Sequence, residues 1–200
     1  MRELIPGLWH WTTEHPGIGQ PVGSHYLATA AAVIDPMTPP EGMAAVRALG
    51  AVEHVVLSCR HHDRDHAAFV EEFGAAFHVS EAGASEYDGE DLSPYRIGEA
   101  IVPGVVAQAN GPIAPDDTVL RLDVEGGALL FADSLLSDGG DLGLMPDSLL
   151  GDDPDAVGGR ILDALEQLLE EDFAHLLFAH GDPVIGDGHQ RLSEFVKNAR

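Results

Sequence analysis

Lysine and cysteine are nearly missing from this chain, in which Lys197 and Cys59 are the only examples. A single cysteine excludes an internal disulfide and fits a reducing compartment. The 200 residues carry 10 basic and 34 acidic side chains, which gives a formal net charge of −24 at pH 7. Such a surface repels phosphate backbones and anionic lipids, so we expect neither a nucleic acid nor a membrane as a partner.

Long apolar runs are also missing. No stretch approaches the roughly 20 apolar residues of a membrane-spanning helix, and residues 1–6 lack the apolar core of a signal peptide. We therefore expect a cytoplasmic protein. A salt-rich cytoplasm favours an acidic, lysine-poor surface because salt screens its self-repulsion, and a high-GC genome would also reduce lysine. A hydrophobic content of 44% suits one globular domain over residues 1–200.

Histidine and aspartate, by contrast, are concentrated in one segment. Residues 58–66 are Ser-Cys-Arg-His-His-Asp-Arg-Asp-His, and they directly follow the apolar residues 55–57. Neutral imidazole and ionised carboxylate are the ligands that borderline to hard divalent ions prefer, so this segment is a candidate metal site. A solvated, charged loop is the competing interpretation, because the chain holds 11 His and 34 acidic residues.

Two later apolar segments favour the metal site. Residues 128–132 have the composition of a strand and end at Asp133, and residues 176–179 form a similar run that ends at His180-Gly181. In an α/β architecture, strand ends of this kind collect on one rim of the sheet, where sites form. We therefore expect Asp133 and His180 to lie near the His/Asp segment.

The pattern of apolar and turn residues predicts that strands run into helices in both halves of the chain. The predicted strands cover residues 8–12, 24–29, 31–35, 52–57, 76–79, 101–108, 118–124, 128–132 and 174–179. The predicted helices cover residues 41–49 and 66–73, a segment starting at Asp153-Pro154, and residues 190–199. We predict residues 83–94 to be a surface excursion with a helical turn.

The order of a His/Asp cluster, a strand ending in Asp133 and a strand ending in His180-Gly181 resembles the metallo-β-lactamase superfamily of metallohydrolases. Residues 7–11, 24–27 and 32–36 are similar to the three opening strands of that family. The resemblance covers nearly the whole chain. It implies an α/β (α+β) fold, a four-layer αββα sandwich.

The first motif of the family, His-x-His-x-Asp-His, fits this sequence in two registers. The first register ends on Asp65-His66 and starts at His61, and it has Asp63 in place of the second His. It implies one complete metal site and one depleted site. The ligands predicted in this register are His61, Asp63, Asp65, His66, Asp133 and His180.

The second register starts directly at the end of the strand. It places Cys59 at the first His and His61 at the second, keeps Asp63, and has Arg64 at the last His. A guanidinium at that position repels a metal ion, so this register favours a fold that has lost its metal. The sequence leaves both registers open.

The resemblance implies one or two divalent metal ions. The imidazole that a later loop of the family supplies is missing here, and Asn110 is the nearest substitute. A neutral amide oxygen is a weak ligand for zinc, so we expect one ion rather than two. Zinc is the first expectation, and the anionic Asp63 and Asp133 also suit iron or manganese.

A metal ion would make the chain a hydrolase, because a bound ion lowers the pKa of its water to about 7 and polarises a carbonyl or phosphoryl oxygen. We predict Asp63 and Asp65 as catalytic groups. The resemblance implies a small-molecule ester, thioester, lactone or phosphoester as substrate. We expect residues 140–153 to form a pocket wall, in which Leu142, Leu144 and Met145 accept an apolar group.

Two alternatives stay open. The chain could be a non-catalytic, metal-free binding or regulatory member of the same fold, or an iron redox protein, which would require a flavin partner. Among the other histidines, His25 and His62 are placed to lie near the rim, where they would contact a substrate or support the ligands.

Overall fold

Two β-sheets face each other in the structure, a computed structural model that describes residues 1–200 except for the side chain of Asn110. The first sheet has the order β1-β2-β3-β4-β5-β6-β7. Its strands are β1 (Arg2–Ile5), β2 (Leu8–His15), β3 (Gln20–Leu27), β4 (Ala32–Ile34), β5 (His54–Val56), β6 (Ala76–Ser80) and β7 (Leu92–Tyr95). The strands from β1 to β4 are antiparallel neighbours, and β4 to β7 are parallel.

The second sheet has the order β15-β14-β11-β10-β9-β8, and a separate hairpin joins β12 to β13. The strands of this half are β8 (Ala100–Val102), β9 (Val105–Asn110), β10 (Thr118–Leu122), β11 (Ala128–Phe131), β12 (Leu136–Asp138), β13 (Asp141–Gly143), β14 (His175–Phe178) and β15 (Val184–Ile185). Strands β11 and β14 are parallel. Their carboxyl ends therefore lie at the same edge of the sheet.

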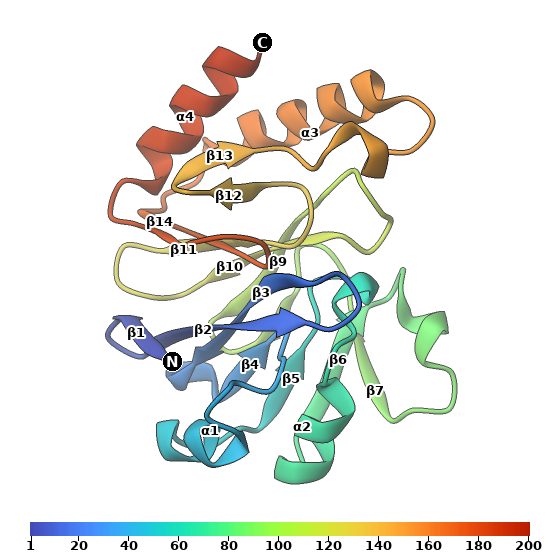
Figure 1. Cartoon of the computed structure of the whole chain (residues 1–200), viewed down its shortest axis with the longest axis vertical. Helices are drawn as coiled ribbons and strands as arrows, with labels where there is room; N and C mark the ends of the chain where they lie inside the picture. The colour runs from blue at the N-terminus through green and yellow to red at the C-terminus, as the bar shows by residue number, and fades with distance from the viewer.

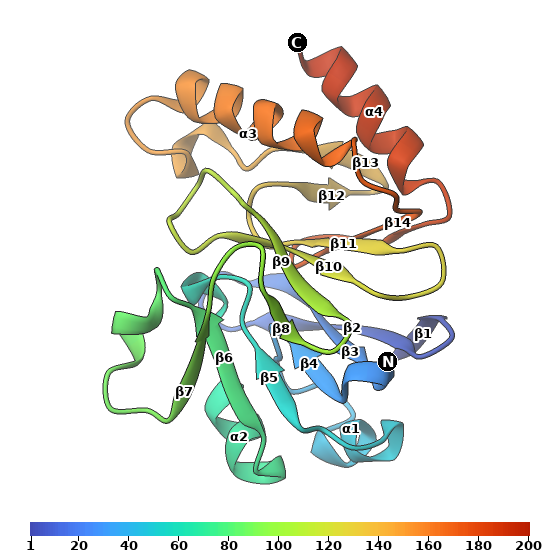
Figure 2. The same cartoon turned by 180° about the vertical axis from the view of Figure 1, so that it is seen from behind.

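Helices cover the outer face of each sheet (Figures 1 and 2). Helices α1 (Met43–Leu49) and α2 (His66–Phe73) lie on the first sheet, and α3 (Pro154–Leu168) and α4 (Gly188–Ala199) lie on the second. The order is therefore helix, sheet, sheet, helix, which confirms the predicted four-layer αββα sandwich.

The core explains why the central strands are continuous apolar runs rather than alternating ones. In β14, Leu177 packs between the two sheets, whereas Leu176 and Phe178 pack in the layer beneath α3 and α4. In β5, Val56 faces the other sheet and Val55 faces α1 and α2. Strands that are buried on both faces need apolar residues at every position.

Helix α3 starts at the predicted position and is amphipathic. The Asp153 carboxylate accepts a hydrogen bond from the Ala156 backbone N–H at 3.1 Å, and Pro154 occupies the first turn. Ile161, Leu165 and Leu168 are buried against the second sheet. These contacts are those of an N-capped amphipathic helix.

Several strands differ from the sequence-based prediction. The predicted strand over residues 101–108 is the hairpin β8–β9, because the chain turns at Pro103-Gly104. The predicted excursion over residues 83–94 contains the expected helical turn at Ala84–Tyr87 and also includes most of β7. Strand β1, which the prediction lacked, pairs with β2 at the edge of the first sheet.

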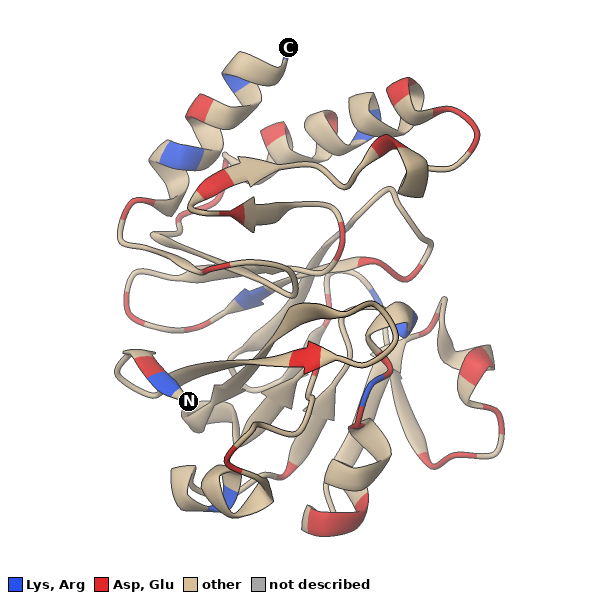
Figure 3. Ribbon diagram, viewed as in Figure 1, with Lys and Arg blue, Asp and Glu red and all other residues tan. Residues whose placement is uncertain are grey.

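Acidic side chains are distributed over loops and helices of both halves, with few basic ones among them (Figure 3). Among the described residues, no helix is both long and apolar enough to span a membrane.

Candidate metal centre

Four strand ends bring polar side chains to one rim of the sandwich. Asp35 follows β4, residues 58–66 follow β5, Asp133 lies beyond β11, and His180 lies beyond β14. Phe131 in β11 is the register partner of Phe178 in β14, so Asp133 and His180 each come two residues after a paired position. The structure places Nε2 of His180 3.3 Å from Oδ1 of Asp133.

A sharp turn after His180 holds its backbone in place. Gly181 has a φ of +111°, and a Cβ there would overlap the carbonyl group of Ser137. Only glycine fits both the conformation and the close approach. The Ser137 N–H donates to the His180 carbonyl at 3.1 Å, which fixes this turn against the β12 segment.

The side chain of His62 enters the same group from the loop after β5. A 3₁₀ turn over Arg60–His62 directs its ring inward, where only 2% of the residue is exposed. Its Nε2 lies 3.2 Å from Oδ1 of Asp133, and its Nδ1 lies 3.1 Å from Oδ2 of Asp35. His62 therefore joins the two halves of the sandwich through two buried carboxylates.

Asp35 orients His62 from behind. It is buried and has a left-handed backbone with a φ of +47°, a conformation that is costly for a residue with a side chain and is often found at functional sites. Its carboxylate also accepts hydrogen bonds from the Ser58 backbone N–H at 2.8 Å and from the Ser58 hydroxyl. With Nδ1–H of His62 donating to Asp35, the Nε2 atom points to Asp133.

Charges within the group shift its pKa values strongly. Burial opposes ionisation of His62, but the charge of Asp35 and the hydrogen bond to Asp133 outweigh burial and raise its pKa to about 9. Burial likewise opposes ionisation of Asp133, but hydrogen bonds from His180 and His62 hold its pKa well below the usual range. In the absence of a metal ion, an imidazolium at His62 thus neutralises the carboxylate.

Asp117 lies behind Asp133 and helps to position it. One oxygen of the Asp117 carboxyl accepts a hydrogen bond from the Asp133 backbone N–H at 3.3 Å. Burial, and then the negative charge of Asp133, raise the pKa of Asp117 to about 7. Gly111 leaves room for this carboxyl, because a Cβ on Gly111 would overlap it.

The ligand atoms of His62, Asp133 and His180 lie within 4.8 Å of one another, close enough to hold one metal ion. Zinc bonds of 2.0–2.1 Å to nitrogen or oxygen in a tetrahedral site place neighbouring ligand atoms about 3.3 Å apart, and the two distances to Oδ1 of Asp133 are 3.2 and 3.3 Å. When Nδ1 of His62 carries its proton, the lone pair of Nε2 faces an anion. A cation must then lie between them, either a second proton or a metal ion.

Cys59, His61 and Asp133 form a second group of possible ligands. Nδ1 of His61 is 3.7 Å from Oδ2 of Asp133, the carboxylate oxygen that does not contact His62. Cys59 is buried, and burial, with several nearby carboxylates, raises the pKa of its thiol far above the usual range. A thiol must be deprotonated to bind a metal, so this group is the poorer of the two.

Three of the predicted ligands lie away from Asp133. The ring of His66 is stacked on Phe77 and hydrogen-bonds Asp63 on one side and Glu90, at 3.1 Å, on the other. The Asp65 carboxylate accepts a hydrogen bond from the Thr38 backbone N–H at 2.7 Å.

The cause of this displacement is the helix that follows. Helix α2 starts at His66, and its first turn packs that residue against β6. The structure therefore brings the side chain of His62, rather than those of Asp63, Asp65 or His66, to Asp133 and His180. The carboxylates of Asp63 and Asp65 do not line the pocket. A catalytic group would have to reach a substrate bound there.

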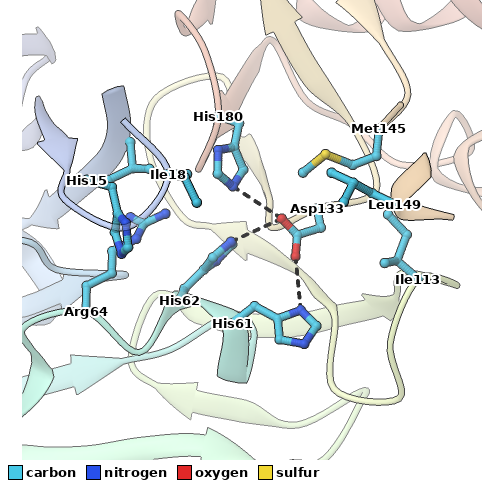
Figure 4. Close-up of a pocket in the computed structure, with 11 residues that line it drawn as sticks. His15, Ile18, His61, His62, Arg64, Ile113, Asp133, Met145, Leu149 and His180 are labelled. Atoms are coloured by element: carbon cyan, nitrogen blue, oxygen red, sulfur yellow. Dashed lines mark hydrogen bonds and ion pairs between the residues drawn. The ribbon is translucent and has the colours of Figure 1, made fainter. Parts of the chain in front are cut away.

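A pocket of about 310 Å³ opens over this group (Figure 4). The side chains of His61, His62, Asp133 and His180 form its polar floor. Five apolar residues line the walls, namely Ile18, Val22, Ile113, Met145 and Leu149. His15 and Arg64 line the side of the pocket opposite Met145 (Figure 4).

The predicted pocket wall is only partly in place. Met145 lines the pocket as expected, whereas Leu142 and Leu144 pack against the core beneath α3 and α4. The predicted substitute ligand Asn110 lies outside the described side chains. His25 is buried beside His10, with 3.2 Å between their ring nitrogens, and does not line the pocket.

Comparisons with known structures agree with this architecture. A metallo-β-lactamase family protein from Thermus thermophilus superposes with a TM-score of 0.67 at 21% identity, covering 98% of this chain and 80% of that one. A metallo-β-lactamase from Hirschia baltica gives 0.65 at 15% identity, covering 98% and 96%. This chain has the metallo-β-lactamase fold.

The same fold also occurs in redox proteins. A flavo-di-iron protein from Thermotoga maritima superposes with a TM-score of 0.65 at 16% identity, and this chain spans 62% of its length.

A scan against models of protein families and a search of curated protein sequences each found no match. The metallo-β-lactamase fold is therefore established by structure, and the chemistry depends on the residues at the rim.

Asp35 has the same signal in the sequence as Asp133. Residues 32–35 are Ala-Val-Ile-Asp, an apolar strand ending in a carboxylate, as in the segment that ends at Asp133. The role of His62 was less visible, because three histidines lie within six residues and only the 3₁₀ turn determines which ring faces inward.

Proposed function

We propose that this chain is a metal-dependent hydrolase whose single divalent ion is held by His62, Asp133 and His180. The observation that supports this proposal best is the convergence of two imidazole Nε2 atoms on one carboxylate oxygen at 3.2 and 3.3 Å. Two histidines and a carboxylate, with one position open to a pocket, are typical of a catalytic zinc site. Zinc is the ion we propose first.

The residues of the chain divide the work of hydrolysis. When bound, the ion would activate a water molecule and polarise the reacting oxygen of the substrate. Asp35 and Ser58 hold His62 in the tautomer that leaves Nε2 free to bind the ion. His61, whose side chain is 58% exposed at the edge of the floor, is placed to exchange a proton between the substrate and solvent.

The pocket favours substrates with an apolar part. Its walls are aliphatic, and the two residues Ile18 and Leu149 expose 54% and 63% of their surface at its edge. Burial of aliphatic carbon against such walls stabilises binding by about 0.8 kcal/mol per CH₂ group. We propose an ester, thioester, lactone or phosphoester that carries an acyl or alkyl group.

A metal-free binding protein is the second candidate. It is supported by the raised pKa of His62, because an imidazolium in this position satisfies Asp35 and Asp133 without a metal ion. The guanidinium of Arg64 in the same pocket would also repel a divalent cation.

Elemental analysis of protein purified without chelator separates these candidates. We expect about one zinc, iron or manganese ion per chain, with loss of the ion in His62→Ala, Asp133→Asn and His180→Ala. His189→Gln, which changes an exposed histidine of α4, is the matched control and should keep the ion. His66→Ala should keep it as well.

Two results would count against the hydrolase. Wild-type protein that holds no ion, even after dialysis against each metal, would favour the metal-free candidate. Loss of the ion in His66→Ala, with retention in His62→Ala, would transfer the site to the predicted ligands Asp65 and His66. Ester, thioester and phosphoester screens should follow only with protein of known metal content.

A further inference from the structure

Arg64 is a half-buried cation in the pocket wall whose hydrogen bonds are incomplete. Its Nη1 atom donates to the backbone carbonyl groups of Gly23 at 2.8 Å and Asp35 at 3.1 Å. Its Nη2 atom is shielded from solvent and has no acceptor among the described residues. A buried donor without an acceptor is unfavourable, so the protein leaves part of the hydrogen-bonding capacity of this guanidinium unused.

The charge of Arg64 is also not matched by a direct ion pair. Burial lowers the pKa of Arg64, and the charges of Asp35 and Asp133 only partly oppose this effect. No carboxylate of the described residues lies within 4.0 Å of its nitrogen atoms, because those of Asp35 and Asp133 pair with His62. Other arginines on the surface do have such partners, for example Arg96 with Glu81 at 2.6 Å. Arg64 is the only Lys or Arg among the residues that line the pocket.

The surroundings of Arg64 combine this positive charge with apolar walls. Ile18 and Val22 line the pocket from the β2–β3 hairpin, which also carries His15. Ile113, Met145 and Leu149 lie across the floor from Ile18 (Figure 4). A ligand that fills the pocket therefore meets a guanidinium at one side, aliphatic side chains along the walls, and the polar group of His61, His62, Asp133 and His180 only at the floor. An amphiphilic anion has this distribution of charge and surface.

We propose that Arg64 binds a carboxylate of the substrate, so that the substrate is an ester or thioester carrying one carboxylate and an apolar chain. This inference rests on the proposed hydrolase function. A planar carboxylate matches the hydrogen-bonding edge of a guanidinium. A monoanion fits better than a phosphate dianion, because the protein has a formal net charge of −24 and Asp133 faces the same pocket.

Calorimetric titration of the metal-free protein tests the anion site separately from catalysis. The probes are octanoate and 1-octanol, which share an apolar chain and differ in charge. Because a hydrogen bond to a charged group contributes about 1.5–3 kcal/mol, we expect octanoate to bind roughly tenfold or more tightly than 1-octanol. Arg64→Gln should abolish this preference, and Arg64→Lys should keep part of it.

Arg96→Gln provides the matched control, because it removes one positive charge at an exposed site outside the pocket. It should leave the preference for octanoate unchanged. Equal binding of the two probes to the wild-type protein would overturn the proposal, and so would a preference that survives in Arg64→Gln. If Arg64→Gln does not fold, as judged by circular dichroism, the wild-type ratio and the Arg64→Lys ratio decide.

With the zinc-loaded enzyme, a pair of chromogenic esters extends the test. 4-Nitrophenyl hydrogen glutarate carries a carboxylate, and 4-nitrophenyl pentanoate is its neutral counterpart. We expect Arg64→Lys to raise KM for the charged ester severalfold with little change in kcat, and to leave both constants for the neutral ester unchanged. Binding of octanoate without any hydrolysis would support the anion site and refute the catalytic proposal.

Discussion

Replacing Asp35 by Asn should weaken metal binding although Asp35 touches no metal ion. The Asp35 carboxylate accepts hydrogen bonds from the Ser58 N–H at 2.8 Å and from Nδ1 of His62 at 3.1 Å. In the variant, the amide oxygen can keep the bond to Ser58, and the amide NH₂ group then faces Nδ1 of His62. An NH₂ donor selects the tautomer with its proton on Nε2, which is the atom that the metal ion requires.

The expected loss is 10- to 100-fold in metal affinity, the usual effect of removing a partner that orients a metal-binding histidine. This loss corresponds to about 1.4–2.7 kcal/mol. Competition with a chromogenic chelator measures the dissociation constant directly, and circular dichroism shows whether the variant remains folded. Asp35 is buried, so the fold must be checked before the affinity is interpreted.

Asp65→Asn is the matched control, since the Asp65 carboxylate accepts a hydrogen bond from Thr38 in the same region without contacting His62, Asp133 or His180. Its affinity should stay within about twofold of wild type, because a change away from the ligands and their partners has a small effect. Metal binding by Asp35→Asn that is as tight as in the wild type would contradict this role of Asp35. An equal loss of affinity in Asp65→Asn would contradict it as well.

Two further predictions concern the rest of the chain. Burial, and then the charge of His54, lower the pKa of His78 from 6.5 to about 4. Between pH 6.5 and pH 4, His78 is therefore protonated in the unfolded state and neutral in the folded state. The contribution of His78 to stability should therefore fall as the pH drops through this window, by at most ~2 kcal/mol at pH 5 because solvent screens a group that is not fully buried. Urea unfolding should show a smaller loss of stability for His78→Gln than for the wild type, and an equal loss would contradict the assignment. Cys59 is buried and the pKa of its thiol is raised. A thiol reagent such as DTNB should therefore label it slowly in the native protein and rapidly in urea. Rapid labelling of the native protein would contradict this prediction, because it would show that the thiol is accessible.

Strand ends were the most predictable part of the site. Asp133 and His180 each follow a run that is buried on both faces, and parallel strands deliver such ends to one rim whatever their loops do. The same rule explains the fold, because runs of this type require a layer on each side. The hairpin β8–β9 was missed because two apolar strands joined by a short turn resemble one longer strand.

The loop after β5 could not be predicted in the same way. Residues 58–66 contain three histidines and two aspartates, so the family motif can be aligned with them in more than one register. Those registers assign His61 or His66 as ligands. The structure instead turns the chain through Arg60–His62 and starts α2 at His66. A 3₁₀ turn has three residues per turn, so a shift of one residue points a different ring inward.

Charge balance gives a physical reason why that inward ring is His62. Asp35 and Asp133 are both buried, and two buried carboxylates need a cation between them or their pKa values rise. His61 reaches only Oδ2 of Asp133, and His66 reaches neither carboxylate, whereas the two ring nitrogens of His62 reach both. A metal ion at Nε2 would supply the required charge when His62 is neutral, and a proton supplies it otherwise. Metal binding should therefore release a proton at neutral pH, which the dependence of the calorimetric enthalpy on buffer ionisation measures, and an enthalpy independent of buffer would contradict this exchange.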